Sequence, residues 1–271
     1  MGQAHGHVGR IDGVDLLIAV DQTEHAAVGV GQRDGMATAR LRQRRGRSQH
    51  LPACGFGFLR SQGQGLLAAG PERDVQNLSR TLRLVQKERR FPTNEEQRVM
   101  ARYVGWGGLK TVFDPKKKDA TDLYGKAQRE LRELLNPQEY PAANGSIRNA
   151  HYTAQGIVDG MWRVVRHMGF NGGRALEPTV GIGNFIGLQP ADMAGSTEWH
   201  AAELDAVTGH MAARLYPEAN ILAATGFQDA PFADGVFDLA IGNPPFGAQT
   251  IDDKSPQRKH LSGMKIHNYI I

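Results

Sequence analysis

The spacing of hydrophobic and polar positions changes twice along the chain. Residues 1–75 contain short apolar islands without a sustained helical or alternating period, so we assign no element to them. From about residue 76 the spacing becomes helical, and beyond Asn171 it predicts strand, loop and helix in repeated order. We therefore expect an extension, a helical segment over 76–150 and a strand-rich segment over 151–271.

Residues 1–75 also differ in composition, because they are rich in Gly, Gln, Arg and His. Three interpretations stay open for this stretch. It is a disordered extension, or it follows a start site placed too far upstream, or it is read in a shifted frame. The expectation common to all three is a disordered or non-native extension.

Three helices are expected before the strands begin. The first is capped by Asn94 and stopped by the glycines at 105–108. The second covers 123–135, and a polar loop follows over 141–146. The third begins at Thr153, whose hydroxyl can accept a free backbone N–H, and continues to about residue 167.

The strand-rich segment predicts an α/β fold with a doubly wound, Rossmann-like sheet of about four strands. Because strands alternate with helices, they should be parallel and joined by right-handed crossovers. The first strand should lie beside the fourth and leave a crevice between their carboxyl ends. The expected strands are 174–177, 199–204, 221–224 and 236–241, with helices at 184–188 and 206–215 between them.

Composition narrows the class of protein without naming its chemistry. Hydrophobic residues make up 40% of the 271 residues, which is enough for a core. Neither a run of 18 apolar residues nor a secretory start is present, so we expect a cytoplasmic protein without a membrane partner. A single cysteine, Cys54, excludes an internal disulfide. Basic runs at 40–47, 87–90 and 116–118 fit a solvated surface first and a nucleic-acid contact second.

A glycine-containing loop follows the first expected strand. Gly181 and Gly183 leave no β-carbon in the way of a ligand that approaches the backbone. A dinucleotide-binding loop would have a third glycine at position 186, where this chain has Ile186. The ligand is therefore expected to lack a pyrophosphate.

Two later loops offer groups for a nucleoside. Glu203 ends the second strand about 20 positions after Gly183, where nucleotide-binding folds keep a carboxylate for the ribose hydroxyls. Leu204 could cover one face of an adenine, while Phe227 and Gln228 supply a stacking surface and a partner for its amine. The alternatives are a charged strand end for Glu203 and a simple turn for the 226–229 loop.

Asn243, Pro244, Pro245 and Phe246 follow the fourth strand directly and suggest a site for a planar amine. The Asn243 side-chain oxygen and the Pro244 carbonyl could accept its two hydrogens and localise its lone pair. Such fixed dipoles lower a barrier by roughly 3 to 4 kcal/mol each. Phe246 would stack on the ring, and the alternative is a proline-rich turn. Upstream, the helix start beside Tyr152 should attract a ligand carboxylate.

These motifs together resemble a known family. Residues 177–185, Glu203 and 243–246 look like those of S-adenosylmethionine-dependent amino methyltransferases, specifically adenine-specific DNA methylases with the cofactor motif before the catalytic one. From about residue 81 onward, the motifs at 90–93 (RFPT), 105–109 (GWGGL) and 149–153 (NAHYT) further resemble the methylase region of large methylase-helicase proteins of phages and mobile elements.

The resemblance implies methyl transfer from S-adenosyl-L-methionine to the N6 amine of adenine in DNA, with the base flipped out and no metal. DNA and the remainder of a larger methylase-helicase polypeptide are the implied partners. The resemblance assigns catalysis to Asn243, Pro244, Pro245 and Phe246. It assigns cofactor binding to Tyr152, Thr153, Glu177, Pro178, Gly181, Gly183, Asn184, Phe185, Glu203, Leu204, Phe227 and Gln228.

The chain departs from the family in two respects. The family often has an acid before Phe227, where this chain has Gly226. The family sheet also has more strands than are expected here, so we expect an incomplete sheet and a fragment of a longer protein. Methylation of RNA or of a glutamine side chain, and an inactive remnant that binds nucleic acid, stay open as alternatives. A dinucleotide-dependent oxidoreductase would leave the Asn243 loop unexplained.

Overall fold

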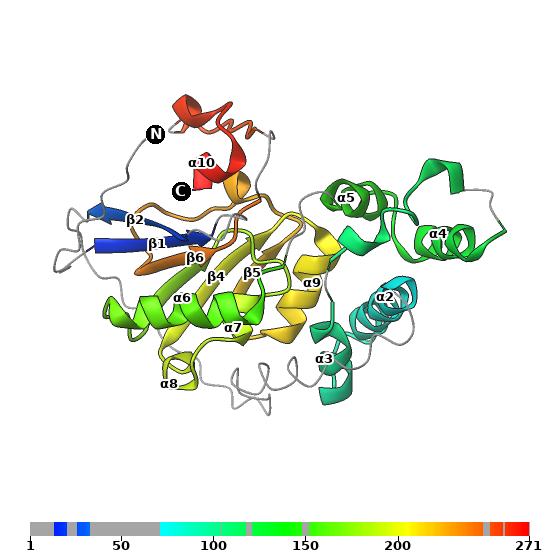
Figure 1. The fold of residues 1–271 in the computed structure, drawn as a ribbon, viewed down its shortest axis with the longest axis horizontal. Helices are drawn as coiled ribbons and strands as arrows, with labels where there is room; N and C mark the ends of the chain where they lie inside the picture. Colours follow the sequence, from blue (N-terminus) through cyan, green and yellow to red (C-terminus); the bar gives the residue numbers. More distant parts are fainter. Residues whose placement is uncertain are drawn as a thin grey trace.

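A six-stranded sheet forms the centre of the protein in the computed structural model (Figure 1), with the strand order β2-β1-β6-β3-β4-β5. The structure describes residues 14–20, 26–32, 71–103, 105–117, 121–147, 152–245, 250–256 and 258–270. The strands are β1 (Val14–Val20), β2 (Ala26–Gln32), β3 (Gly173–Glu177), β4 (Thr197–Glu203), β5 (Asn220–Ala223) and β6 (Leu239–Gly242).

The four strands expected from the sequence are present and parallel. β3 pairs with β4, and β4 pairs with β5. β3 also pairs with β6, with Leu176 opposite Ala240, so the first expected strand lies beside the fourth as predicted. The α/β class of the fold is confirmed, and the carboxyl ends of these strands meet along one edge of the sheet.

Two further strands come from the stretch to which no element was assigned. β1 pairs in parallel with β6, with Ile18 opposite Ile241, and β2 pairs antiparallel with β1. The sheet therefore has six strands where about four were expected. Two segments of the expected extension are strands because β1 pairs with the edge of β6 and β2 pairs with β1, and the rest of residues 1–70 lies outside the described residues.

Figure 1 shows two sets of helices: α6 crosses one face of the sheet, whereas α2 to α5 lie together beyond α9. We call the described residues of 71–147, which contain α2 to α5, the helical group. The α-helices are α2 (Pro71–Lys87), α3 (Asn94–Ala101), α4 (Leu123–Leu134), α5 (Glu139–Ser146), α6 (Gln155–His167), α7 (Asn184–Gly187), α8 (Ala191–Ala194), α9 (Ala206–Leu215) and α10 (Ile266–Ile270). Short 3-10 turns are η2 (Gly107–Leu109), η3 (Pro115–Lys117), η4 (Phe227–Asp229) and η5 (Lys259–Leu261).

Two helix starts differ from the prediction. α3 is capped by Thr93 and not by Asn94: the Thr93 hydroxyl accepts from the Glu96 N–H, and the Glu96 carboxylate accepts from the Thr93 N–H at 2.7 Å. This reciprocal capping box satisfies two free donors at the helix start. α6 begins after Ala154, without a side-chain cap, so the predicted capping role of Thr153 is wrong.

α5 lies where a polar loop was predicted over 141–146. Asn136 accepts from the Glu139 N–H at 2.8 Å, and Glu139 is buried in an ion pair with Arg83 of α2. Ala143 is fully buried on the same helix. Contacts with other helices therefore override a local sequence with weak helix propensity.

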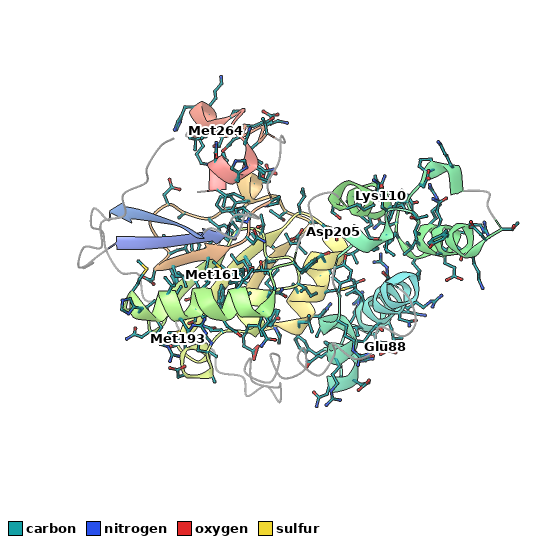
Figure 2. All side chains as sticks on the ribbon, viewed as in Figure 1. Glu88, Lys110, Met161, Met193, Asp205 and Met264 are labelled. Carbon is teal, nitrogen blue, oxygen red and sulfur yellow. The ribbon has the colours of Figure 1, made fainter. Side chains whose placement is uncertain are left out.

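The helical group and the sheet share one buried core. Trp106 of the helical group, Trp162 of α6 and Trp199 of β4 are all buried in it. α3 and α5 both contact α9, which packs on β4 and β5. Figure 2 places Asp205 at the start of α9, near the helical group. No helix in the described part of the chain is long and apolar enough to cross a membrane.

Candidate active site

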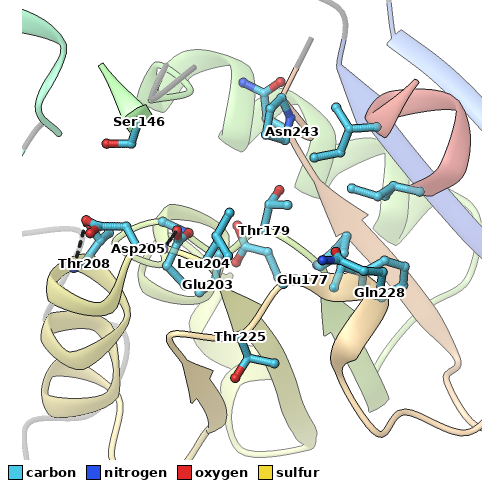
Figure 3. A pocket seen from close by; sticks show the side chains of 18 of the residues that line it. Ser146, Glu177, Thr179, Glu203, Leu204, Asp205, Thr208, Thr225, Gln228 and Asn243 are labelled. Atoms are coloured by element: carbon cyan, nitrogen blue, oxygen red, sulfur yellow. Dashed lines mark hydrogen bonds between the residues drawn. The ribbon is translucent and has the colours of Figure 1, made fainter. Parts of the chain in front are cut away.

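A cavity of about 640 Å³ lies at the carboxyl ends of the parallel strands. In Figure 3, Ser146 and Asn243 lie on one side of it, and Glu177, Glu203 and Thr225 lie on the other. The sequence-predicted residues that line it are Tyr152, Thr153, Glu177, Pro178, Gly181, Asn184, Phe185, Glu203, Leu204, Phe227, Gln228, Asn243 and Pro245. The fold thus brings these residues together, whereas their roles stay predictions.

Two of the predicted site residues that the structure describes, Gly183 and Pro244, are not on this wall. Gly183 caps α7 with a φ of 80°, and a β-carbon there would overlap the ring of Tyr216. The structure therefore explains Gly183 by backbone conformation and packing. Pro244 is buried beside the cavity without lining it, and Phe246 lies outside the described residues.

The glycine loop after β3 is held close to its neighbours. Gly181 has a φ of 54°, and a β-carbon there would approach the Tyr152 ring to 3.3 Å. The Gly181 N–H donates to Glu203 Oε2 at 2.8 Å. Asn184 of α7 donates through its side chain to the Thr153 carbonyl at 3.1 Å. The loop, the end of β4 and the segment before α6 are thereby fixed as one frame.

Backbone N–H groups donate to the Glu203 carboxylate at the end of β4. Its Oε1 accepts from the Asp205 N–H at 2.8 Å, while Oε2 faces Gly181. Burial raises the pKa of the Glu203 carboxyl to about 7, against the lowering effect of these N–H groups. Each oxygen retains a lone pair that a ligand hydroxyl can reach.

Glu177 ends β3 with only 2% of its surface exposed. Its Oε2 has no hydrogen-bond partner among the described residues. Burial, followed by the nearby charge of Glu203, raises the pKa of the Glu177 carboxyl well above its ordinary value. A buried carboxyl of this kind is costly unless a ligand supplies a donor or a positive charge.

Two more buried oxygens beside the cavity lack partners in the described part of the chain. They are Oδ1 of Asn243, directly after β6, and Oγ1 of Thr179, in the loop after β3. Native proteins pair the great majority of buried polar atoms. Both atoms are therefore acceptors that a donor-bearing ligand could satisfy.

Gln228 takes the space beside Gly226 in the loop after β5. A β-carbon on Gly226 would approach the Gln228 side-chain amide to 2.5 Å. The Gln228 side-chain nitrogen donates to Asp229 at 2.8 Å, which orients the amide, and Arg258 donates to the backbone carbonyl of Gln228 at 3.2 Å. The amide is thus oriented at the cavity wall, next to the position where the resembling family often has an acid.

Several residues that line the cavity were not predicted from the sequence. Trp106, Ala142, Gly145 and Ser146 come from the helical group, and residues of 250–252 and 266–270 come from the end of the chain. Trp106 lies between glycines, in a motif that predicts a helix stop and contributes to the family resemblance but does not predict a place on the cavity wall. No local pattern marks the others. Within the described residues, no cluster of His, Cys, Asp and Glu could hold a metal ion.

No family model matches the chain, but the chain is similar to a phage protein and to a solved structure. The chain is 29% identical over 121 residues, or 44% of its length, to the "Defense against restriction protein B" of Escherichia phage P1. The match covers 5% of that phage protein, so the chain spans a small part of its length. A solved structure of a proposed class I S-adenosylmethionine-dependent methyltransferase from Listeria monocytogenes is similar over 73% of this chain and 67% of that chain, at 12% identity and a TM-score of 0.38. Neither similarity assigns the chain to a family.

Proposed function

We propose that the chain transfers a methyl group from S-adenosyl-L-methionine to the exocyclic N6 amine of adenine in DNA. One observation carries the proposal: a single cavity joins the Glu203 carboxylate to the amide oxygen of Asn243, which has no partner among the described residues. The first group suits a ribose, and the second suits a planar amine.

The residues present fit the cofactor. The volume of about 640 Å³ lies within the range of small-molecule sites. Glu203 can accept from ribose hydroxyls, and Leu204, 68% exposed, offers an apolar face to the adenine. The unpartnered Oε2 of Glu177 suits the cofactor's ammonium group. When bound, the cofactor would supply an electrophilic methyl group.

The acceptor end would act on the amine through fixed dipoles. The adenine amine is a poor nucleophile because its lone pair is delocalised into the ring. An Asn243 oxygen that accepts one N–H would localise that pair. The role of the Pro244 carbonyl as the second acceptor is part of the proposal on the sequence alone, since Pro244 does not line the cavity. Methyl transfer then forms the C–N bond, breaks the C–S bond and releases an amine proton. Stacking by Phe246 is part of the proposal on the sequence alone.

The proposal extends to partners. DNA is the proposed substrate, and the chain is proposed to act with the rest of a longer methylase-helicase polypeptide. An Asn-Pro-Pro acceptor would serve any planar amine, so RNA and a glutamine side chain are the competing substrates. A remnant that only binds nucleic acid is the competing reading without catalysis.

The test combines cofactor binding with substrate choice. Wild type, Asn243→Ala and the control Asn220→Ala, at an exposed position of β5, would be incubated with labelled S-adenosylmethionine and separate DNA, RNA and protein pools. We expect N6-methyladenine in DNA, detected by mass spectrometry. Asn243→Ala should keep S-adenosylhomocysteine binding by calorimetry and lose roughly 100-fold or more in transfer. Label in RNA or protein alone would refute the DNA substrate, and absence of saturable cofactor binding would refute the methyltransferase.

A further inference from the structure

The helical group reaches into the cavity through Trp106. The indole is 1% exposed and belongs to the residues that line the cavity. Its Nε1–H donates to Asp205 Oδ2 at 2.9 Å, across 99 residues of sequence. A buried hydrogen bond thus joins the helical group directly to the loop between β4 and α9.

Asp205 transmits this contact to the ribose acceptor. Its Oδ2 also accepts from the Thr208 N–H at 3.2 Å and from the Thr208 hydroxyl. The Asp205 side chain thereby caps the start of α9. Its own N–H donates to Glu203 Oε1 at 2.8 Å. Besides Asp205, the backbone N–H groups of Gly181 and Leu204 hold Glu203, so a displacement of Asp205 would remove one of these donors and shift the Glu203 carboxylate.

A second contact from the helical group reinforces the first. The Tyr103 hydroxyl lies 3.1 Å from Thr208 Oγ1. The Tyr103 ring also meets the Tyr152 ring edge-on, with centroids 6.1 Å apart, and Tyr152 packs against Gly181. Tyr103 and Trp106, three residues apart, therefore contact the surroundings of both partners of the Gly181–Glu203 hydrogen bond.

We infer that Trp106 is a positioning residue: it fixes Asp205 and thereby holds Glu203 in the orientation that binds a ribose. The helical group then sets the affinity of the cavity for nucleosides, although its own side chains need not touch the ribose. This inference rests on the proposed function, because it takes the nucleoside half of that cavity as the binding site.

The chain offers a matched control for the test. Trp199 is also buried, and its Nε1–H also donates at 2.9 Å, to Gln189, but Trp199 does not line the cavity. Trp106→Phe and Trp199→Phe each remove one buried indole N–H and keep an aromatic ring. Both should lose similar amounts of unfolding free energy in urea titrations, so their difference reports on position and not on stability.

The measurement is calorimetric binding of S-adenosyl-L-homocysteine and of its 2′-deoxy analogue to the full chain. Trp106→Phe should weaken binding of the ribose form about fivefold to tenfold and bring the two affinities closer together. Trp199→Phe should leave both affinities unchanged. Tyr103→Phe, which removes only the hydroxyl, should shift binding in the same direction by a smaller factor and serves if Trp106→Phe does not fold.

The outcomes separate the inference from the proposed function. Two results would overturn the role of Trp106 alone, provided that the wild-type chain binds normally. One is an equal effect of Trp106→Phe and Trp199→Phe on binding. The other is an unchanged ribose preference in both Trp106→Phe and Tyr103→Phe. Absence of any binding to the wild-type chain would overturn the proposed function, and the inference would fail with it.

Discussion

Replacing Glu203 by Gln should change the pH dependence of stability in a direction that the buried carboxyl dictates. Burial raises the pKa of Glu203 from 4.5 to about 7 in the folded chain. The unfolded chain loses this proton near pH 4.5, whereas the folded chain keeps it up to about pH 7. The folded state therefore binds more protons in this window, and its stability falls as the pH rises from about 4.5 through 7.

The magnitude follows from the two pKa values. Their difference of about 2.5 corresponds to about 3 kcal/mol of unfolding free energy, at about 1.4 kcal/mol for each pKa unit. Gln cannot ionise, so the variant lacks this loss. It also carries a fixed cost of about 1 to 3 kcal/mol, since its amide nitrogen cannot accept from either Gly181 or Asp205. The fixed cost does not depend on pH.

Urea denaturation at pH 5 and pH 8 measures the effect. The unfolding free energy of Glu203→Gln minus that of wild type should rise by about 2 to 3 kcal/mol between the two pH values. Subtraction removes the pH dependence of shared groups that Glu203 does not influence, such as His210, whose pKa is lowered by burial. Glu198→Gln, at an exposed position of the same strand, is the control. The same pH slope in wild type and Glu203→Gln would refute the argument.

Three further substitutions test separate features. Gly183→Ala should destabilise the fold by about 2 kcal/mol in urea because its β-carbon overlaps the Tyr216 ring, and it should cost more than Gly235→Ala, which has positive φ but open space. Gln228→Ala should reduce the preference for S-adenosyl- over S-inosyl-homocysteine in calorimetry, and an unchanged ratio would contradict its contact with the adenine amine. Thr93→Ala should lower the unfolding free energy by about 1 kcal/mol, whereas Thr93→Ser should be close to neutral.

The parallel strands were predictable because strands buried on both faces are short apolar runs bounded by turn residues. The prediction for α9 matches its observed bounds. β6 begins at Leu239, three residues later than predicted. The Asp238 side chain accepts the Arg174 N–H at 2.8 Å, and Phe237 packs against His200. The Asp238 N–H also donates to the Arg174 carbonyl at 2.8 Å, so one backbone bond and one side-chain bond pair this position before the strand begins.

Other elements depend on partners that a local pattern does not contain. β1 extends the sheet because β6 offers a free edge in register with Ile18. α5 depends on the ion pair between Glu139 and Arg83, which are 56 residues apart. No window of 11 to 18 residues includes both members of such a pair. Periodicity therefore predicts the elements that bury their own apolar face and misses those that a distant contact stabilises.

The same distinction holds within the cavity. Glu203 and Asn243 could be placed together because the carboxyl ends of the parallel strands of one sheet meet at the same edge, and only β3 separates β4 from β6. The strands supply that geometry whatever the loops contain. Trp106 has no such constraint, since its place on the cavity wall depends on how the helical group packs against α9. Its contact with Asp205 could be found only in three dimensions.

The buried polar groups around the cavity indicate that it is a binding site and not a packing defect. Glu177 and Glu203 are two carboxyls whose burial opposes ionisation, and Asn243 and Thr179 add buried oxygens without partners in the described chain. Each such group costs the fold free energy that an apolar residue of the same size would not. A sequence shaped by stability alone would replace them. A ligand with hydroxyls, an ammonium group and an amine would satisfy all four, so the same contacts that recognise it would also stabilise the fold.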